Sequence, residues 1–321
     1  MRTYIIRRLL QMIPVFIGIV VLVFVIVHNA PGGPYATLMD PRMTPEIKAE
    51  LNAKLGLDKP IYVQFYNWGL EAVKGNLGYS TIYQQRVTDV IKVYIGPTFL
   101  LTFIALLFSL LVGIPTGIIS ATRQYSKTDH VLTIFSLIGI SMPSFFFGLL
   151  LLQVFTITLG WTPFSGMRTI GAYHPNKLVL YLDIARHMFL PVLVLGLGST
   201  ASFMRYTRSA MLEVVRQDYI RNARAKGLKE QVVIYKHALR NALIPIITLL
   251  GFWVPGLLSG AVITESIFGW PGMGRVAIRA AMNRDYPLLL GINMLLSFLT
   301  LLGNLMADIF YGIADPRIKY D

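Results

Sequence analysis

The chain has 321 residues, of which 55% are hydrophobic and 14% are charged, and its formal net charge is +13. Soluble domains carry roughly 25% charged residues, so this composition excludes a disordered protein, a nucleic-acid-binding tail protein and an ordinary soluble enzyme. The sequence has no cysteine, which excludes disulfides, thiolate metal sites and thiol catalysis.

Six segments are long and apolar enough to cross a bilayer, which takes about 20 mostly apolar residues. In chain order they are Leu9–Val27, Thr98–Ala121, Val131–Leu159, about Met188–Met204, Leu243–Thr264 and Leu288–Phe310. They predict an all-α membrane protein with six transmembrane helices. The first segment is longer than the apolar core of a signal peptide, so we expect it to be a retained helix.

The distribution of Lys and Arg predicts the orientation of these helices. If the N-terminus lies in the cytoplasm, nine basic residues between Arg205 and Arg240 fall in one cytoplasmic loop. An even number of spans then places the C-terminus inside as well, which is an N-in/C-in arrangement. The expected partner of the positive charge is the anionic surface of the lipid bilayer, and not nucleic acid.

The spans and the segments between them predict four regions. They are an N-terminal transmembrane helix (1–30), an external segment (31–95), a five-helix core (96–311) that includes a cytoplasmic loop (205–242), and a cytoplasmic tail (312–321). In the external segment we expect two short helices, one between Thr44 and Gly56 and one between Asp58 and Gly75. Trp68 falls on the apolar side of the second helix.

The centre of the cytoplasmic loop predicts a short helix with an unusual face. Asp218 is placed to cap the start of this helix. Tyr219, Ile220, Ala223 and Gly227 then fall on one side at helical spacing. Small residues on a helix face allow close approach by another protein, so we expect the loop to dock into a cleft. A helix that lies on anionic lipid is the alternative, because it needs only the basic residues.

The predicted spans are almost free of charged residues. Only the sixth span contains one, Asp308, and Asn304 lies on the same face, so we expect both to form interhelical hydrogen bonds. Carriers driven by ion gradients usually need buried ionisable groups on their path, so this absence argues against them and against an enzyme acting within the bilayer. The sequence has no Walker A loop and no metal-ligand spacing. We therefore expect no catalytic, cofactor-binding or metal-binding residue in this chain.

An ordered series of motifs resembles the permease subunits of dipeptide and oligopeptide ABC importers along nearly the whole chain. These motifs are Tyr4–Leu10, Ala30–Pro34, Leu55–Pro60, Gly75–Ser80, Asp218–Leu228, His237–Pro245, Glu265–Gly274, Arg284–Pro287 and Asp315–Ile318. Any one of them is weak, but the set in this order is specific. Alignment on Gly227 puts the Glu-Ala-Ala of the general importer loop on Arg221-Asn222-Ala223, where only the last Ala is kept.

The resemblance implies a bacterial cytoplasmic-membrane protein with the type I importer (MetI-like) permease fold, which is not itself an enzyme. It implies four kinds of partner: a second related permease, two cytoplasmic ABC ATPase subunits, an external peptide-binding protein and the bilayer. The loop that couples to the ATPases is expected to use Asp218, Tyr219, Ile220, Ala223, Ala225, Gly227 and Leu228. The expected contacts with the binding protein, inferred from outer position and exposed aromatics, are Trp68, Glu265, Trp270, Asp285 and Tyr286.

Three alternatives remain open at this stage. The same fold imports nickel chelates, glutathione or antimicrobial peptides in related systems, and the binding protein sets most of that choice. A stand-alone secondary carrier or channel is a second alternative, which the uncharged spans disfavour. A membrane anchor or assembly scaffold without a transport path is the third.

Overall fold

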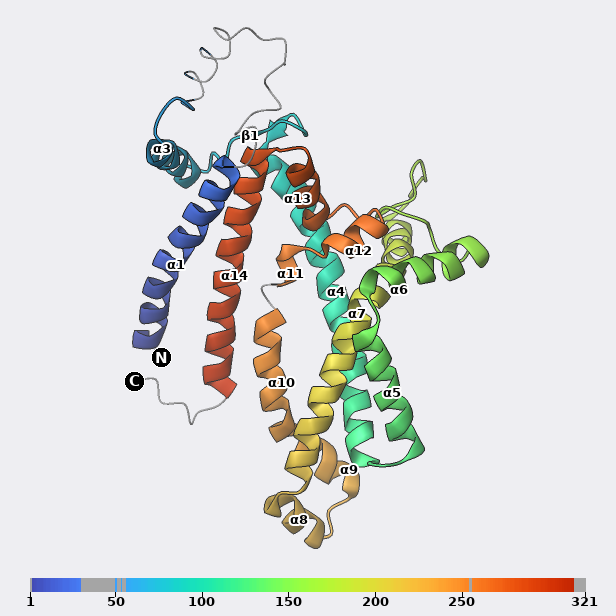
Figure 1. The fold of residues 1–321 in the computed structure, drawn as a ribbon. Helices are drawn as coiled ribbons and strands as arrows, with labels where there is room; N and C mark the ends of the chain where they lie inside the picture. The colour runs from blue at the N-terminus through green and yellow to red at the C-terminus, as the bar shows by residue number, and fades with distance from the viewer. Residues whose placement is uncertain (1, 30–49, 51–52, 54–55, 254–255, 315–321) are drawn as a thin grey trace.

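The computed structural model describes residues 2–29, 50, 53, 56–253 and 256–314. The described part is mostly helical, with one two-stranded antiparallel hairpin (Figure 1). The helices are α1 (Arg2–His28), α3 (Ile61–Val73), α4 (Val87–Thr122), α5 (Lys127–Ser141), α6 (Ser144–Leu151), α7 (Lys177–Val215), α8 (Asp218–Ala225), α9 (Glu230–Val232), α10 (Leu239–Trp253), α11 (Gly256–Ser259), α12 (Val262–Ile267), α13 (Met273–Met282) and α14 (Tyr286–Ala314). Two π-helical segments, η2 (Leu152–Thr158) and η3 (Val233–Ala238), and the strands β1 (Tyr79–Ser80) and β2 (Gln85–Arg86) complete the list.

Four helices in the described part, α1, α4, α7 and α14, are each long and apolar enough to cross a membrane. They contain the first, second, fourth and sixth predicted spans. Helices α4 and α7 extend well beyond those predictions, to 36 and 39 residues. Their extra turns carry polar residues. Hydropathy does not assign such residues to a membrane span, but the helical hydrogen bonding continues through them.

The third predicted span is not one continuous helix, because α5 and the α6–η2 segment meet at an angle of 104°. The bend falls at Met142 and Pro143, whose backbones are extended. Proline has no N–H to continue a helix and disfavours the helical conformation of the residue before it. If the bent pair counts as one span, the described part contains five candidate membrane spans.

The fifth predicted span is interrupted as well. Helix α10 is described as far as Trp253, and α11 and α12 are short helices separated at Gly260, whose φ is +85°. This left-handed conformation is open to glycine and ends a right-handed helix. One continuous helix from Leu243 to Thr264 was therefore a wrong prediction, and the count of six spans stays a prediction.

The bundle has two distinct ends (Figure 1). Helices α3 and α13 and the β1–β2 hairpin lie at one end, and α8 and α9 lie at the other. Helices α1 and α14 run antiparallel, and Arg8 Nε and Asp308 Oδ2 are 3.2 Å apart between them. The prediction that Asp308 bonds between helices is thus confirmed.

The segment predicted to be external (31–95) is described in part. Helix α3 follows Pro60 and ends at Val73, Lys74 is its C-cap, and Gly75 has a φ of +86°. The second predicted short helix is therefore confirmed at both ends. The first, between Thr44 and Gly56, lies almost wholly outside the described residues, as do the Ala30–Pro34 and Asp315–Ile318 motifs.

The most extensive helix contact among the described residues joins α4 and α7. Glycines at the contact let the two backbones approach: a Cβ built on Gly117 would lie 2.7 Å from the Met204 oxygen, and one on Gly113 would lie 2.8 Å from the Thr200 oxygen. Lipid supplies no hydrophobic driving force for the association of two helices. Close backbone contact at small residues stabilises the pair instead. The core of the bundle is therefore built around this pair.

We predict that Gly117→Ala destabilises the chain, because the added methyl group forces α4 and α7 apart. The expected cost is about 1–3 kcal/mol, the usual range for overpacking. The matched control is Gly18→Ala on α1, where a Cβ would meet nothing within 4 Å. Thermal unfolding in detergent checks this, and equal midpoints for the two variants would contradict the close contact.

Candidate coupling helix and outer cap

Helix α8, the centre of the predicted cytoplasmic docking loop, has defined ends. Its N-cap is Gln217, and Asp218 is the first helical residue, so the prediction that Asp218 caps the helix was wrong. At the other end Gly227 has a φ of +77° and its N–H donates to the Arg224 carbonyl at 2.9 Å. The Leu228 N–H also reaches the Ala223 carbonyl, at 3.4 Å. These two bonds form a Schellman motif, which explains the glycine physically.

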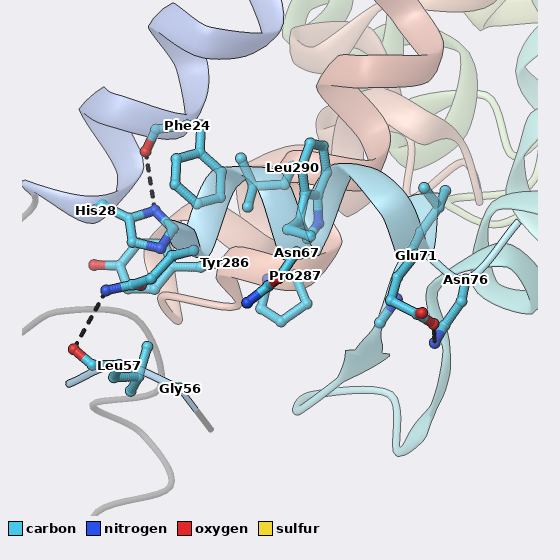
Figure 2. A pocket seen from close by; sticks show the side chains of 14 residues that line it. Phe24, His28, Gly56, Leu57, Asn67, Glu71, Asn76, Tyr286, Pro287 and Leu290 are labelled. Atoms are coloured by element: carbon cyan, nitrogen blue, oxygen red, sulfur yellow. Dashed lines mark hydrogen bonds between the residues drawn. The ribbon is translucent and has the colours of Figure 1, made fainter. Parts of the chain in front are cut away.

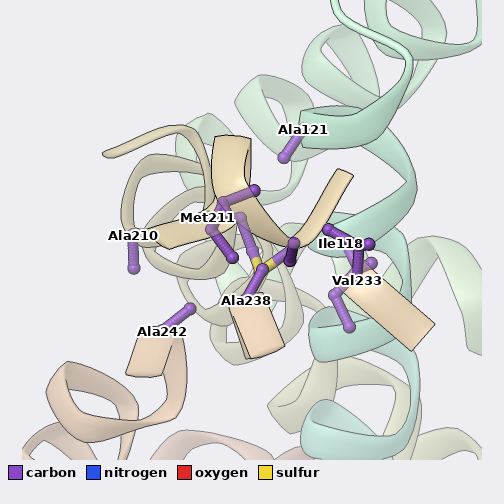
Figure 3. Close-up of a cluster of buried hydrophobic side chains, with 9 residues drawn as sticks. Ile118, Ala121, Ala210, Met211, Val233, Ala238 and Ala242 are labelled. Atoms are coloured by element: carbon purple, nitrogen blue, oxygen red, sulfur yellow. The ribbon is translucent and has the colours of Figure 1, made fainter. Parts of the chain in front are cut away.

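One face of α8 packs into the chain's own core. Ile220 is fully buried and Ala223 nearly so. They belong to a cluster to which α4, α7, η3 and α10 also contribute, and whose side chains Figure 3 shows. The cluster consists of Ile118, Ala121, Ala210, Met211, Ile220, Ala223, Val233, Ala238 and Ala242. Ile220 and Ala223 therefore hold α8 on the bundle, and the prediction that they face another protein does not hold.

The opposite face of α8 is exposed. Asp218, Arg221 and Ala225 lie away from the buried side, and the neighbouring Tyr219 and Leu228 are also exposed. The Tyr219 hydroxyl accepts a hydrogen bond from Asn241 Nδ2 at 2.9 Å, which ties α8 to α10. Of the residues predicted for the coupling loop, the structure thus leaves Asp218, Tyr219, Ala225, Gly227 and Leu228 accessible.

An ion pair joins α8 to the segment that follows it. The Arg224 guanidinium donates to both carboxylate oxygens of Glu230, at 2.7 and 3.1 Å. This hydrogen bonding lowers the pKa of Glu230 below its ordinary value. Together with the Schellman motif, the pair gives α8 and α9 a defined relative placement.

A buried ionic cluster fixes α4, α5 and α7 to one another close to α8. Asp129 in the first turn of α5 is buried and accepts two hydrogen bonds from Arg208 of α7, at 3.0 and 2.9 Å. Ser120 of α4 donates to the same carboxylate, and the Tyr125 N–H donates at 3.0 Å. The sequence analysis missed this cluster, because its members lie far apart in the chain: Ser120 falls inside the second predicted span, Asp129 just before the third and Arg208 just after the fourth.

At the other end of the bundle, a fully buried carboxylate caps α13. Glu265 accepts hydrogen bonds from the Arg275 N–H at 2.9 Å and from the Thr98 hydroxyl at 3.1 Å. The Thr98 hydroxyl in turn accepts from the Met273 N–H at 2.7 Å. These are N–H groups of the first turn of α13, which would otherwise lack partners and whose dipoles favour a negative charge. The cap therefore ties α12 and α13 to α4.

The Gly-Trp-Pro-Gly-Met-Gly segment from Gly269 to Gly274 completes this cap. Trp270 is fully buried, and its Nε1 donates to the Pro97 carbonyl at 3.0 Å. A Cβ on Gly272 would lie 2.2 Å from the Glu265 carboxyl carbon. Glycine is therefore required there for the carboxylate to reach the helix. The segment thus serves close packing within the chain.

A second buried carboxylate caps α14 in the same way. Asp285 precedes the helix and accepts from the Leu288 N–H at 3.2 Å. Its other oxygen accepts from the Ser80 hydroxyl at 2.5 Å and from the Ile82 N–H at 3.1 Å. Asp285 therefore fastens the β1–β2 hairpin onto the end of α14.

These contacts correct the predicted surface for the external binding protein. Glu265, Trp270 and Asp285 are fully buried and Tyr286 is 5% exposed, so none of them can form a docking surface. Their side chains are used within the chain to close helix ends. The aromatic residues exposed at this end include Tyr62, Tyr66 and Tyr173.

Trp68, the fifth predicted contact, lies in a hollow of about 280 Å³ between α1, α3 and α14 (Figure 2). Its ring lies 5.7 Å from that of Phe24, and Tyr286 also lines the hollow. Trp68 Nε1 is buried and has no hydrogen-bond partner among the described residues. Trp68 therefore anchors α3 to the bundle.

The described residues contain no group of three or more His, Asp or Glu side chains that could hold a metal ion. The arrangement consists of a short helix with one exposed face at one end and two capped helix starts at the other, joined by long apolar helices. Such an arrangement suits transmission of movement across a membrane.

Comparison with known proteins agrees with this architecture. Residues 113–320 match the model of the family described as "Binding-protein-dependent transport system inner membrane component", and residues 1–102 match the model of its N-terminal part. The oligopeptide transport system permease protein AppB of Bacillus subtilis (strain 168) is 42% identical over 100% of both chains. The dipeptide transport system permease protein DppB of Escherichia coli (strain K12) is 40% identical over 100% of this chain and 99% of its own length.

A chain of the solved inward-facing MetNI methionine ABC transporter has a similar fold. The TM-score is 0.57 at 14% identity, and the match covers 71% of this chain and 97% of the other. At this identity the likeness shows the fold alone. The match confirms the type I importer (MetI-like) permease fold that the motifs imply.

We predict that Asp285→Ala loosens the hairpin at the end of α14, because it removes the N-cap and the acceptor for Ser80. The loss of a cap costs about 1–2 kcal/mol. Asp89→Ala is the matched control, since Asp89 is exposed at the start of α4. Limited proteolysis within 79–86 and thermal unfolding check the effect. Equal protection of the hairpin in both variants would contradict it.

We also predict that Arg208→Met strongly destabilises the chain, because Asp129 stays buried without its cation. Removing one partner of a buried pair costs about 3 kcal/mol or more. Arg205→Met on the same helix is the control, since Arg205 is exposed. If the two variants unfold at the same temperature, the Asp129–Arg208 pair does not hold α5 to α7.

Proposed function

Because the chain belongs to the family of binding-protein-dependent transport system inner membrane components, we propose that it is a permease subunit of an ATP-driven peptide importer in a bacterial cytoplasmic membrane. It would form half of the translocation path together with a second, related permease. ATP hydrolysis would take place in two separate cytoplasmic subunits, and an external binding protein would deliver the peptide. The orientation would be N-in/C-in with six spans.

The main support for a coupling role is that one face of α8 is buried in the chain and the opposite face is exposed. Its inner face is fixed in the core by Ile220 and Ala223, while Asp218, Arg221 and Ala225 on the outer face are exposed. A partner that displaces the exposed face of such a helix also displaces the helices packed on its buried face, because packed interiors transmit displacement. An ATPase subunit is the partner that the family membership suggests for this face.

The buried ionic cluster supplies a route for this movement. Helix α8 follows directly on α7, and Arg208 of α7 holds Asp129 of α5. A displacement of α8 would therefore move α7 and α5 together at this end of the bundle. At the outer end, the caps on α13 and α14 would keep the short helices attached to α4 and the hairpin while the long helices tilt.

Peptide is the substrate that the names of the relatives support. The relatives in Bacillus subtilis and Escherichia coli are named as oligopeptide and dipeptide permeases. Nickel chelates, glutathione and antimicrobial peptides stay as alternatives within the same transport mechanism. The external binding protein would decide among them, so its ligand is the quantity to measure.

The first test is to purify the tagged chain from native membranes in mild detergent and to identify co-purifying proteins by mass spectrometry. We expect a second permease and two ATPase subunits with Walker motifs. Any co-purified binding protein is then titrated with di- to pentapeptides and with nickel. Recovery of the chain alone, under conditions where a known ABC complex survives, would contradict the proposal and favour a stand-alone carrier or a scaffold.

We predict that Ala225→Glu abolishes ATPase co-purification and peptide uptake while the chain stays folded. Ala225 is exposed on the outer face of α8, so a larger, charged side chain disturbs docking without entering the core. Ala172→Glu, in an exposed loop distant in sequence from α8, is the matched control and should leave both measurements unchanged. Normal assembly and uptake by Ala225→Glu would show that this face does not contact an ATPase.

A further inference from the structure

A hollow of about 810 Å³ lies at the end of the bundle that carries α8 (Figure 1). Three segments form its wall: the end of α4 with the loop that leads to α5 (121–126), the end of α7 (212–216) and one side of α8. We call this feature the basic hollow, because each of the three segments contributes arginine to it. Its arginines are Arg123, Arg216, Arg221 and Arg224.

The positive charge of the basic hollow is not balanced within the chain. The Arg123 and Arg216 guanidinium groups form no ion pair with any residue of the described part. The two arginines of α8 pair with Asp218 and Glu230, but neither acid lines the hollow. No other acidic residue is among the described residues that line it. Because like charges repel one another, an anionic ligand would stabilise this arrangement.

The basic hollow lies where two membrane helices end. Arg123 is the C-cap of α4 and Arg216 is the C-cap of α7, and both helices are long and apolar enough to cross a membrane. Tyr125 also lines the hollow and is 76% exposed. Tyrosine and basic residues are typical of the boundary between hydrocarbon and water, where the lipid headgroups lie. The position of the hollow thus favours an anion that belongs to a lipid.

An apolar surface continues from the basic hollow along the membrane helices. Ile119 lies one helical turn before Arg123 on α4, and it is 37% exposed. Helix α5 starts after Ser126, which lines the hollow, and it exposes Val131 and Ile134. A lipid with its phosphate between the arginines can place its acyl chains on this surface. A free anion has no apolar part that would use it.

We propose that the basic hollow binds the phosphate headgroup of an anionic membrane lipid such as phosphatidylglycerol. Guanidinium groups bind phosphate oxygens through paired hydrogen bonds, and basic pockets beside membrane helices suit such headgroups. The site is separate from the face of α8 proposed for the ATPase, because Asp218 and Ala225 do not line the hollow. A bound headgroup bridges α8 to the end of α7 and to the loop before α5, so it helps to hold the coupling helix on the bundle.

The test measures lipid binding by the full chain, purified in mild detergent with any subunits that stay attached. Native mass spectrometry follows its titration with phosphatidylglycerol and, separately, with phosphatidylcholine of the same acyl chains, which has no net charge. Arg123→Gln/Arg216→Gln removes the two arginines that lack an acidic partner and leaves α8 unchanged. Arg168→Gln/Arg186→Gln is the matched control, because it removes the same charge from exposed residues that do not line the hollow.

We expect the unsubstituted chain to bind phosphatidylglycerol at least tenfold more tightly than phosphatidylcholine. Arg123→Gln/Arg216→Gln should lose most of this preference, since each basic residue near an anionic lipid contributes about fivefold in affinity. The control variant should keep the preference. Equal binding of the two lipids by the unsubstituted chain, or an equal loss of preference in the control, would overturn the proposal.

Two further measurements distinguish other sources of the anion. Inorganic phosphate is added to the lipid-depleted chain, and thermal unfolding is recorded. If phosphate stabilises the unsubstituted chain but not Arg123→Gln/Arg216→Gln, and phosphatidylglycerol stabilises neither, the ligand is a free anion and the lipid assignment is wrong. If the double variant keeps its lipid preference but loses the ATPase subunits, the hollow is a protein interface and the proposal fails. Neither result bears on the proposed transport function, which lipid binding does not require.

Discussion

The close contact of α4 with α7 is the constraint on which the rest of the structure depends. In a bilayer, apolar side chains gain little by leaving lipid for one another, so helices hold together through near approach of their backbones and through polar bonds. Gly113 and Gly117 allow that approach, because a side chain at either position would strike the α7 backbone. The same two helices carry the groups that organise the ends. Helix α7 leads into α8 and holds Arg208, and α4 supplies Ser120 at one end and Thr98 at the other.

Three buried carboxylates at the ends of the bundle form the polar bonds that join its segments. Asp129 is paired with Arg208, while Glu265 and Asp285 accept from the first N–H groups of α13 and α14. Each carboxylate joins segments that are far apart in the sequence and is saturated by hydrogen bonds, so it stabilises the fold. None of them lies at mid-depth, where a carrier driven by protons or sodium would need a titrating group. The apolar middle of the bundle thus fits an importer that takes its energy from ATP outside the membrane.

The distribution of breaks in the helices also has a functional meaning. The bend at Pro143 and the left-handed Gly260 interrupt two predicted spans, and both expose backbone that a membrane tolerates only beside protein or water. At the first break, Pro143 cannot donate to the Gly139 carbonyl, and Gly139 is buried against α7. The ends of the bundle are thus fastened by polar bonds while two of its spans are interrupted, which fits the proposed coupling at one end and opening in between.

The sequence alone determined the membrane class, four long spans, helix α3, helix α8 and the family, because hydropathy, 3.6-residue periodicity and ordered motifs are local properties of the chain. It also predicted the interhelical role of Asp308. Only the tertiary structure decided which way each motif faces. Glu265, Trp270, Asp285 and Tyr286 looked like an outer surface and are buried, and Ile220 and Ala223 looked like a docking face and point inward. A pattern shows that a helix has two sides, but which side is covered depends on segments up to about two hundred residues away, as Ser80 and Asp285 illustrate.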